Sequence, residues 1–205
     1  CSKKLFQNEL KNLKTKIDFQ IFDGKSSFNK KKIYLFDIPL NNKNLSLKKK
    51  NSYINNSFNS GLNFLKNNNP LALINGPISK AKFLRGKYNG ITEYLAYKTK
   101  SLNEVMLIFN KDLSVSPITT HIPVSQVTPK IKKKVIINKI KSIHEFYERY
   151  LGFKPKIAIT GLNPHCETFV GKNVEKSEIM PAIKILKEKN IKIFGPFAAD
   201  TIFLK

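Results

Sequence analysis

The chain has 205 residues, with an apolar fraction of 41% and a charged fraction of 25%, which are ordinary values for a soluble globular protein. A chain of this length can bury a sizeable core, and it has neither a long apolar run nor a signal-peptide layout, so we expect no membrane partner. Cys1 and Cys166 have no CxxC spacing and suggest no disulfide framework, which favours a reducing, cytoplasmic setting.

The formal net charge of +23 is the kind of charge found in nucleic-acid-binding proteins. The arginines, however, are only Arg85 and Arg149, and guanidinium groups are the usual readers of phosphates and base edges. The many lysines accompany many asparagines and isoleucines, which indicates a compositional bias that places lysine on solvated surfaces. We therefore predict that the lysines form a solvated surface and that the protein has no nucleic-acid partner. A lesser alternative is that their positive field steers anionic substrates inward.

The first half of the chain predicts helices and short strands in alternation. Apolar residues with helical spacing indicate two helices, and short apolar runs rich in β-branched and aromatic residues indicate strands. The expected elements are a helix over 2–14, strands over 18–22 and 32–38, a polar loop over 41–52, a helix through Ile54 and Leu65, and a buried strand over 71–76.

The second half continues the alternation and sets the predicted fold class. The expected elements are a helix from Thr92 to Tyr97, strands over 104–109 and 113–120, a long helix from about Pro129 to Tyr150, a strand over 155–161, a helix from Glu175 to Lys189, and a strand over 191–195. Strands that alternate with helices predict an α/β layer fold with a largely parallel or mixed sheet. No repeat or linker divides the chain, so we expect no separate domain boundary.

Four of the predicted strands end in polar clusters. These clusters occupy residues 76–80, 119–123, 161–167 and 195–201. In open α/β sheets, ligands bind in the loops beyond the carboxyl ends of the strands. The convergence of four such clusters therefore predicts a functional site at one edge of the sheet.

His121 and His165 each follow a predicted strand, and each neighbours a proline that stiffens its loop. Neutral imidazole at a rigid strand end is a good ligand for a divalent metal such as zinc. A single histidine in such a place is better interpreted as an ordinary hydrogen-bonded loop residue. Because two histidines occupy equivalent strand ends, the metal site and the ordinary loop residue are equal alternatives here. His144, inside the basic helix, is predicted to be a surface residue.

Other residues of the clusters are weaker candidates. Cys166 and Glu167 stand beside His165 as further ligands or their partners, although nothing pairs Cys166 with a base. Asp200 is suited to bind an amine or a metal, or to cap a following segment. Lys80 is suited to contact substrate or cofactor. Because the GxGxxG fingerprint is absent, glycine spacing does not indicate NAD.

The four clusters and the start of the helix at Thr92 resemble motifs of the 4-hydroxythreonine-4-phosphate dehydrogenase family of vitamin B6 biosynthesis. The resembling segments follow one another in the same order as the motifs of that family. The motifs read NGPISK, GITEYLA, TTHIPVSQV, GLNPHCE and GPFAADTIF. The resemblance runs from about Leu71 to Lys205, whereas residues 1–70 match only in the order of strands and helices. The N-terminal GDPAGIGPE-type motif and the C-terminal phosphate and NAD contacts are missing, so we expect residues 1–205 to be the central part of one longer dehydrogenase chain.

The resemblance implies a three-layer α/β/α fold with a mixed, largely parallel sheet, similar to the isocitrate and isopropylmalate dehydrogenases. It also implies a homodimer that binds NAD and one divalent metal (Zn, Mg or Co) through three histidines drawn from both subunits. His121 and His165 match two ligand positions, and the third belongs to an HDQ segment expected beyond Lys205. By the same resemblance, Asp200 faces the substrate; we assign Asp200 and Lys80 a catalytic role.

The implied activity is the oxidation of 4-phosphohydroxy-L-threonine to 2-amino-3-oxo-4-phosphohydroxybutanoate, which decarboxylates to 3-amino-2-oxopropyl phosphate. Thr92 keeps a substrate-binding hydroxyl, but Ile91 replaces the substrate-contacting histidine of the family's GHTE motif. A dehydrogenase of 4-phospho-threonate or 4-phospho-erythronate is therefore the alternative, and a basic nucleic-acid-binding module is a distant one. The family's NPHAGE is shortened here to NPHCE, which remodels the loop after His165.

Overall fold

The structure is a computed structural model that describes residues 1–22, 29, 31–40, 45–68, 72–166 and 173–204. The chain divides into two compact units, Cys1–Gly86 and Lys87–Lys205. That residues 1–205 are the central part of one dehydrogenase chain stays a prediction. No helix within the described ranges is both long and apolar enough to cross a membrane.

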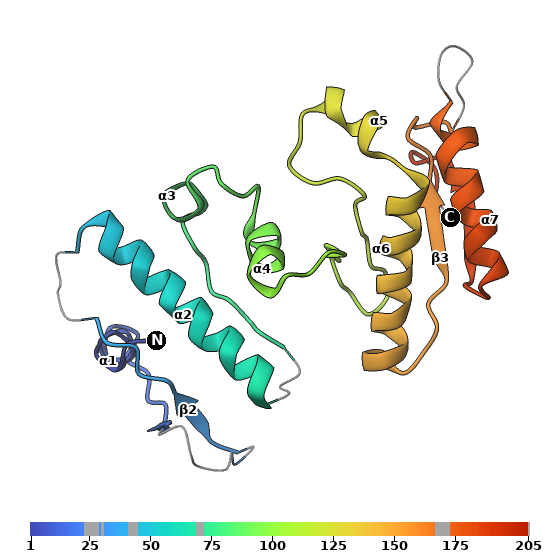
Figure 1. Ribbon diagram of the computed structural model, residues 1–205. Helices are drawn as coiled ribbons and strands as arrows, with labels where there is room; N and C mark the ends of the chain where they lie inside the picture. Colours follow the sequence, from blue (N-terminus) through green and yellow to red (C-terminus); the bar gives the residue numbers. More distant parts are fainter. Residues whose placement is uncertain (23–28, 30, 41–44, 69–71, 167–172, 205) are drawn as a thin grey trace. The chain divides into compact units, whose positions relative to one another are not determined.

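The first unit combines helices with a small parallel sheet (Figure 1). Its elements are α1 (Lys3–Asn12), β1 (Phe19–Ile21), β2 (Ile33–Leu35), α2 (Leu47–Asn68) and α3 (Lys80–Leu84). The strands β1 and β2 pair in parallel, with Phe19 opposite Ile33. The first helix and the two short strands expected from the sequence are thereby confirmed.

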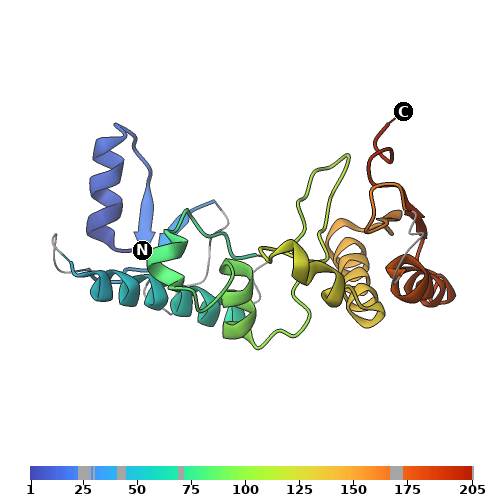
Figure 2. The ribbon, with the colours of Figure 1, turned by 90° about the horizontal axis from the view of Figure 1, so that it is seen from above.

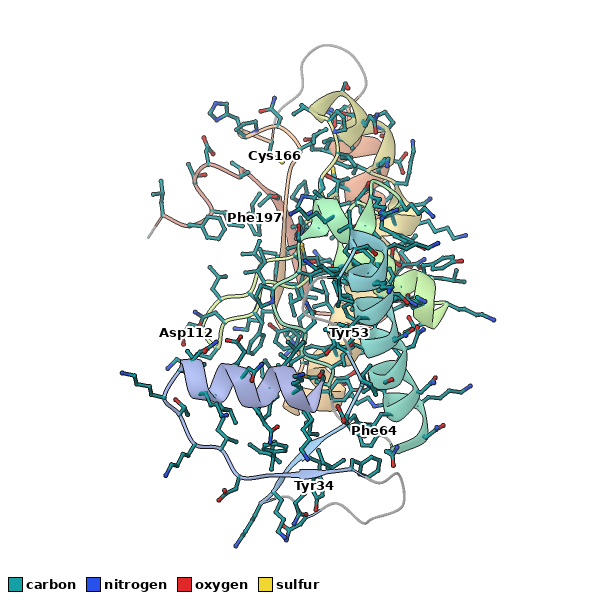
Figure 3. All side chains as sticks on the ribbon, turned by 90° about the vertical axis from the view of Figure 1, so that its left-hand side faces the viewer. Tyr34, Tyr53, Phe64, Asp112, Cys166 and Phe197 are labelled. Carbon is teal, nitrogen blue, oxygen red and sulfur yellow. The ribbon has the colours of Figure 1, made fainter. Side chains whose placement is uncertain are left out.

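Aromatic side chains hold the sheet of the first unit to α2. The ring of Phe36, just after β2, lies 4.5 Å from that of Phe22 and 5.0 Å from that of Phe64 on α2. At the start of the chain, the backbone N–H of Ser2 donates to the hydroxyl of Tyr53 at 2.8 Å. Figure 3 labels Tyr53 and Phe64, which both project from α2. The apolar face predicted for this helix therefore serves as the core of the unit.

Helix α2 begins earlier than the sequence predicted, because residues 47–52 of the expected loop are helical. Ser46 explains the start: its carbonyl accepts the N–H of Lys50 at 3.0 Å, and its hydroxyl lies 3.4 Å from the N–H of Lys49. A serine in this position satisfies amides that have no partner within the helix. Residues 45 and 46 of that loop prediction are not helical, and 41–44 lie outside the described residues.

The buried strand predicted over 71–76 is wrong for residues 72–76, which form no strand. Ile74 is 93% exposed, and the side chain of Leu73 instead approaches α2 at Gly61, where a Cβ would lie 3.1 Å from it. The apolar run thus packs one side chain on a helix and pairs with no strand. Leu71 itself lies outside the described residues.

The second unit also contains a parallel strand pair covered by helices. Its elements are α4 (Ile91–Thr99), η1 (Val124–Gln126), α5 (Val127–Lys130), α6 (Lys133–Phe146), η2 (Tyr147–Leu151), β3 (Ile157–Thr160), η3 (Glu175–Ile179), α7 (Met180–Glu188) and β4 (Ile193–Phe197). The strands β3 and β4 pair in parallel, with Ile157 opposite Ile193, and the register shifts before Thr160 pairs with Phe197.

Two predictions for the second unit need correction. The strands expected over 104–109 and 113–120 are reduced to one antiparallel bridge between Ile108 and Val115, whose side chains are 58% and 44% exposed and so lie outside the core. The helix expected from Pro129 to Tyr150 is interrupted between α5 and α6. Its apolar spacing survives the break, because Ile136 and Ile140 are buried on one face of α6.

The core of the second unit lies between α6, α7 and the strand pair. Figures 1 and 2 show α6 and α7 side by side. The buried apolar residues are Ile131, Ile136, Ile140, Val174, Ile179, Ala182, Ile183, Leu186, Ile191 and Ile193. Leu186 and Ala182 on α7 are 0% exposed. This core fixes the positions of β3 and β4, and with them the loops that follow their carboxyl ends.

Glu178 joins η3 to the first turn of α6. Its Oε2 accepts the backbone N–H of Lys133 at 2.7 Å, and its Oε1 lies 3.7 Å from Nζ of Lys132. Because that N–H has no acceptor within the helix, Glu178→Ala is expected to lower the free energy of unfolding by about 1 kcal/mol. Urea unfolding measures this loss, and Glu178→Gln, which keeps an acceptor, should lose less. Equal midpoints for wild type and the alanine variant would contradict the role.

Candidate active site

The loops that follow β3 and β4 lie together at the carboxyl end of the strand pair. The backbone N–H of Gly161 donates to the carbonyl of Phe197 at 2.9 Å, and that of Ala199 donates to the carbonyl of Pro164 at 2.7 Å. Figure 3 labels Cys166 and Phe197 at this end of the unit. Two of the four predicted polar clusters therefore meet, as expected for parallel strands.

His165 and Asp200 contact each other across these two loops. The Nδ1 atom of His165 lies 2.9 Å from Oδ2 of Asp200, and the two side chains are 76% and 37% exposed. The backbone N–H of His165 donates to Oδ1 of Asn163 at 3.0 Å, which shapes the turn. A histidine whose Nδ1 faces a carboxylate has its Nε2 available for a ligand or a metal.

Glu175, at the start of η3, forms hydrogen bonds with the same loop. Glu175 is only 4% exposed. Its Oε1 accepts the backbone N–H groups of Leu162 at 2.9 Å and Asn163 at 3.1 Å. The sequence predicts Glu175 only as the beginning of a helix. An acidic residue placed just after a Gly/Asn/Pro loop was the available signal, but it does not reveal which amides the carboxylate meets.

His121 lies beside the turn that begins α4. Its backbone has a φ of 52°, and its Cδ2 would lie 3.9 Å from a Cβ placed on Gly90. Glu93 in the first turn of α4 accepts the hydroxyl of Thr120 at 3.2 Å, which ties the histidine loop to the helix. Ile91 and Thr92 are the first two residues of α4, so the structure brings both into the neighbourhood of His121.

An open pocket of about 410 Å³ adjoins this turn. Its lining residues are Asn89, Glu93, Ile118, Thr119, Thr120, Ile122, Lys130, Lys132 and Val135. In the same helix, burial and then the neighbouring Tyr88 raise the pKa of Tyr94 above its ordinary value. Tyr94 therefore stays protonated and neutral across the physiological pH range.

Lys80, Glu167 and Cys166 are the remaining candidates. Lys80 is the first residue of α3 and belongs to the first unit, where its side chain is exposed. Glu167 lies outside the described residues. Cys166 packs against Gly161, where a Cβ would come within 2.8 Å of its Sγ, in agreement with a packing role.

The prediction that His144 is a surface residue is wrong. Its side chain is only 12% exposed, and its Nε2 lies 3.3 Å from Oε2 of Glu148, one helical turn further along the chain. The residue lies in the last turn of α6, just before η2 begins. Its position is nevertheless remote in sequence from every polar cluster.

The donor atoms fit a divalent metal in their chemistry. Two imidazoles suit zinc or cobalt, and the carboxylate partner of His165 is the typical companion of a metal-bound histidine. Within the described ranges, however, no three His, Cys, Asp or Glu side chains come close enough together to hold a metal ion.

Known proteins resemble this chain in sequence. A 4-hydroxythreonine-4-phosphate dehydrogenase from Sulfurihydrogenibium sp. (strain YO3AOP1) is 43% identical over 137 residues, covering 64% of this chain and 42% of that protein. The protein of the same name from Pseudoalteromonas atlantica is 32% identical over 179 residues, covering 83% of this chain and 55% of that protein. The matched region thus spans about half the length of these curated relatives.

The fold is also that of a solved enzyme. The crystal structure of 4-hydroxythreonine-4-phosphate dehydrogenase from Klebsiella pneumoniae matches with a TM-score of 0.81 at 24% identity, over 99% of this chain and 65% of that chain. Together with the two parallel strand pairs, this match confirms the predicted α/β class.

A family model described as "Pyridoxal phosphate biosynthetic protein PdxA" matches residues 1–205. The match confirms the resemblance inferred from the five motifs, and it extends that resemblance over the first 70 residues, where the sequence motifs were silent. The chain therefore belongs to the PdxA family of pyridoxal phosphate biosynthetic proteins.

Proposed function

We propose that the full-length protein oxidises 4-phosphohydroxy-L-threonine to 2-amino-3-oxo-4-phosphohydroxybutanoate in vitamin B6 biosynthesis, with NAD and one divalent metal. The product would then decarboxylate to 3-amino-2-oxopropyl phosphate. Membership of the PdxA family, whose curated members include enzymes named 4-hydroxythreonine-4-phosphate dehydrogenase, supports the reaction. The observation that carries it is the His165–Asp200 pair at the carboxyl ends of β3 and β4.

In this proposal the residues of the second unit bind and orient, and the bound groups supply the redox chemistry. His121 and His165 would hold the metal, which would supply Lewis-acid chemistry at the substrate hydroxyl, and NAD would supply the hydride acceptor. Asp200 fixes the imidazole of His165 through Nδ1 and presents its other carboxylate oxygen to the substrate. The hydroxyl of Thr92, exposed in the first turn of α4, donates a hydrogen bond to the substrate.

The finer features of the proposal concern the whole protein. We propose a cytoplasmic homodimer with a three-layer α/β/α fold, in which the subunits share the metal site. The metal is Zn, Mg or Co, and its third histidine belongs to a segment beyond Lys205. Lys80 takes a catalytic role in the assembled enzyme.

The proposed reaction is tested by following NAD reduction at saturating NAD with three substrates. We expect 4-phosphohydroxy-L-threonine to have a kcat/KM at least about tenfold above those of 4-phospho-threonate and 4-phospho-erythronate, because an amine that pairs with a carboxylate is worth more than 1 kcal/mol. Treatment with a chelator should abolish the rate, and a divalent metal should restore it.

The comparison also decides between the two candidate reactions. A higher kcat/KM for either phosphorylated four-carbon acid would favour the alternative enzyme, in agreement with the missing histidine at Ile91. Full activity after chelation, confirmed by metal analysis of the treated protein, would contradict the metal site. Neither result depends on knowing which metal is bound in the cell.

A further inference from the structure

Glu175 is a buried carboxylate that belongs to neither the proposed ligands nor the substrate contacts. It is 4% exposed, and its Oε1 accepts two backbone amides from the described part of the loop after β3. A buried carboxylate is stable only where donors such as backbone amides replace its lost water. The amides in question belong to Leu162 and Asn163, which immediately precede the turn at His165.

Further hydrogen bonds connect this loop to itself and to the loop after β4. Within the described residues, the amide of Cys166 donates to Asn163 and the amide of His165 to the Asn163 side chain, while the carbonyl of Pro164 accepts Ala199. Glu175 instead belongs to η3, whose Ile179 is part of the hydrophobic core. The Glu175 side chain therefore connects the loop to the packed core and restrains the position of the loop.

We propose that Glu175 is a positioning residue for His165. Its Oε1 fixes the backbone at Leu162 and Asn163, and thereby fixes the direction of the imidazole relative to Asp200, while it touches neither metal nor substrate. The inference rests on the proposed role of His165 as a metal ligand. A ligand held by a rigid supporting contact loses less freedom when it binds, so the affinity for metal is higher.

Because Oε1 accepts both of these loop amides, variants of Glu175 can separate the acceptor from the charge. Glu175→Gln keeps one carbonyl oxygen at the position of Oε1, so it is expected to preserve both amide bonds. Glu175→Ala removes the acceptor, and Glu175→Asp withdraws it by one methylene while keeping the charge. The matched control is Glu178→Ala, because Glu178 is also a carboxylate of η3 but its bonds lead to the start of α6.

Two measurements on the full-length protein test the inference. Amide hydrogen exchange reports on Leu162 and Asn163, with Ile157 as an internal reference because its amide donates to Lys192 within the strand pair. Absorption spectra during titration with Co²⁺ report the affinity and the ligand geometry. In Glu175→Ala and Glu175→Asp we expect both loop amides to exchange at least about tenfold faster than in wild type, with Ile157 unchanged, and cobalt affinity to fall about tenfold.

Glu175→Gln should restore both readouts to near wild type, whereas Glu178→Ala should lower the unfolding midpoint without changing either. Wild-type amide exchange and cobalt spectra in both Glu175→Ala and Glu175→Asp would overturn the inference. His165→Ala separates this failure from failure of the proposed function. If that variant binds cobalt like wild type, His165 is not a ligand, and faster exchange in the Glu175 variants then shows a structural role only, which also overturns the inference.

Discussion

Replacing His165 with alanine in the full-length protein is expected to lower the rate of NAD reduction about a thousandfold or more. The metal-site interpretation requires each imidazole, because a three-ligand site that loses one ligand loses most of its affinity. Removal of the metal forfeits several kcal/mol of charge stabilisation in the transition state, and each 1.36 kcal/mol corresponds to a factor of about ten in rate. The same loss is expected for His121→Ala.

The measurement combines initial rates with metal content of the purified variants. His144→Gln is the matched control, since His144 is the other histidine of the chain and pairs with Glu148 away from the polar clusters. It should retain the wild-type rate within about twofold. Wild-type turnover and full metal content in either alanine variant would refute the assignment of that histidine.

Gly195→Ala is expected to be the most destabilising small substitution in the second unit, at about 3 kcal/mol or more. Gly195 has a φ of 115°, which side chains of L-residues rarely adopt, and a Cβ there would lie 2.4 Å from the carbonyl oxygen of Ile159. Backbone strain contributes about 1–3 kcal/mol, and forcing the strands apart adds a cost of similar size. Guanidinium unfolding monitored by circular dichroism measures the total.

Gly152→Ala separates the two contributions. Gly152 also has a positive φ, 75°, but a Cβ there would meet no atom within 4 Å. The control variant should therefore lose only about 1–2 kcal/mol, the cost of a left-handed backbone for an ordinary residue. Equal losses in the two variants would show that the contact with Ile159 contributes nothing.

The sequence predicted those elements whose signal is local. The helices α1 and α4 and the strands of both parallel pairs follow from spacing and composition, and the histidine and aspartate of the site follow from their position after strands. The run at Leu73 and Ile74 looked equally strand-like, but a strand needs a partner, and a single sequence does not say whether one is in reach. Ser46 was a local signal that the loop interpretation overlooked.

Contacts that depend on the tertiary fold were not predictable in this way. Glu175 meets Leu162 only because a loop and a helix start return to the same place, 13 residues apart in sequence. Glu178 likewise reaches Lys133 across 45 residues. The polar residues that support the site are therefore less visible in the sequence than the histidines that they support, because their partners are backbone amides, which every residue except proline has.

The hydrogen bonds between the loops after β3 and β4 have a consequence for how sequences in this family can diverge. The bonds from Gly161 to Phe197 and from Ala199 to Pro164 use backbone atoms only. These bonds therefore constrain the residues only through the space around the backbone, as at Gly161, where a Cβ would lie 2.8 Å from Sγ of Cys166. Main-chain bonds of this kind can be inherited without inheriting every side chain, and the fold of this chain matches the Klebsiella pneumoniae structure with a TM-score of 0.81 at 24% identity.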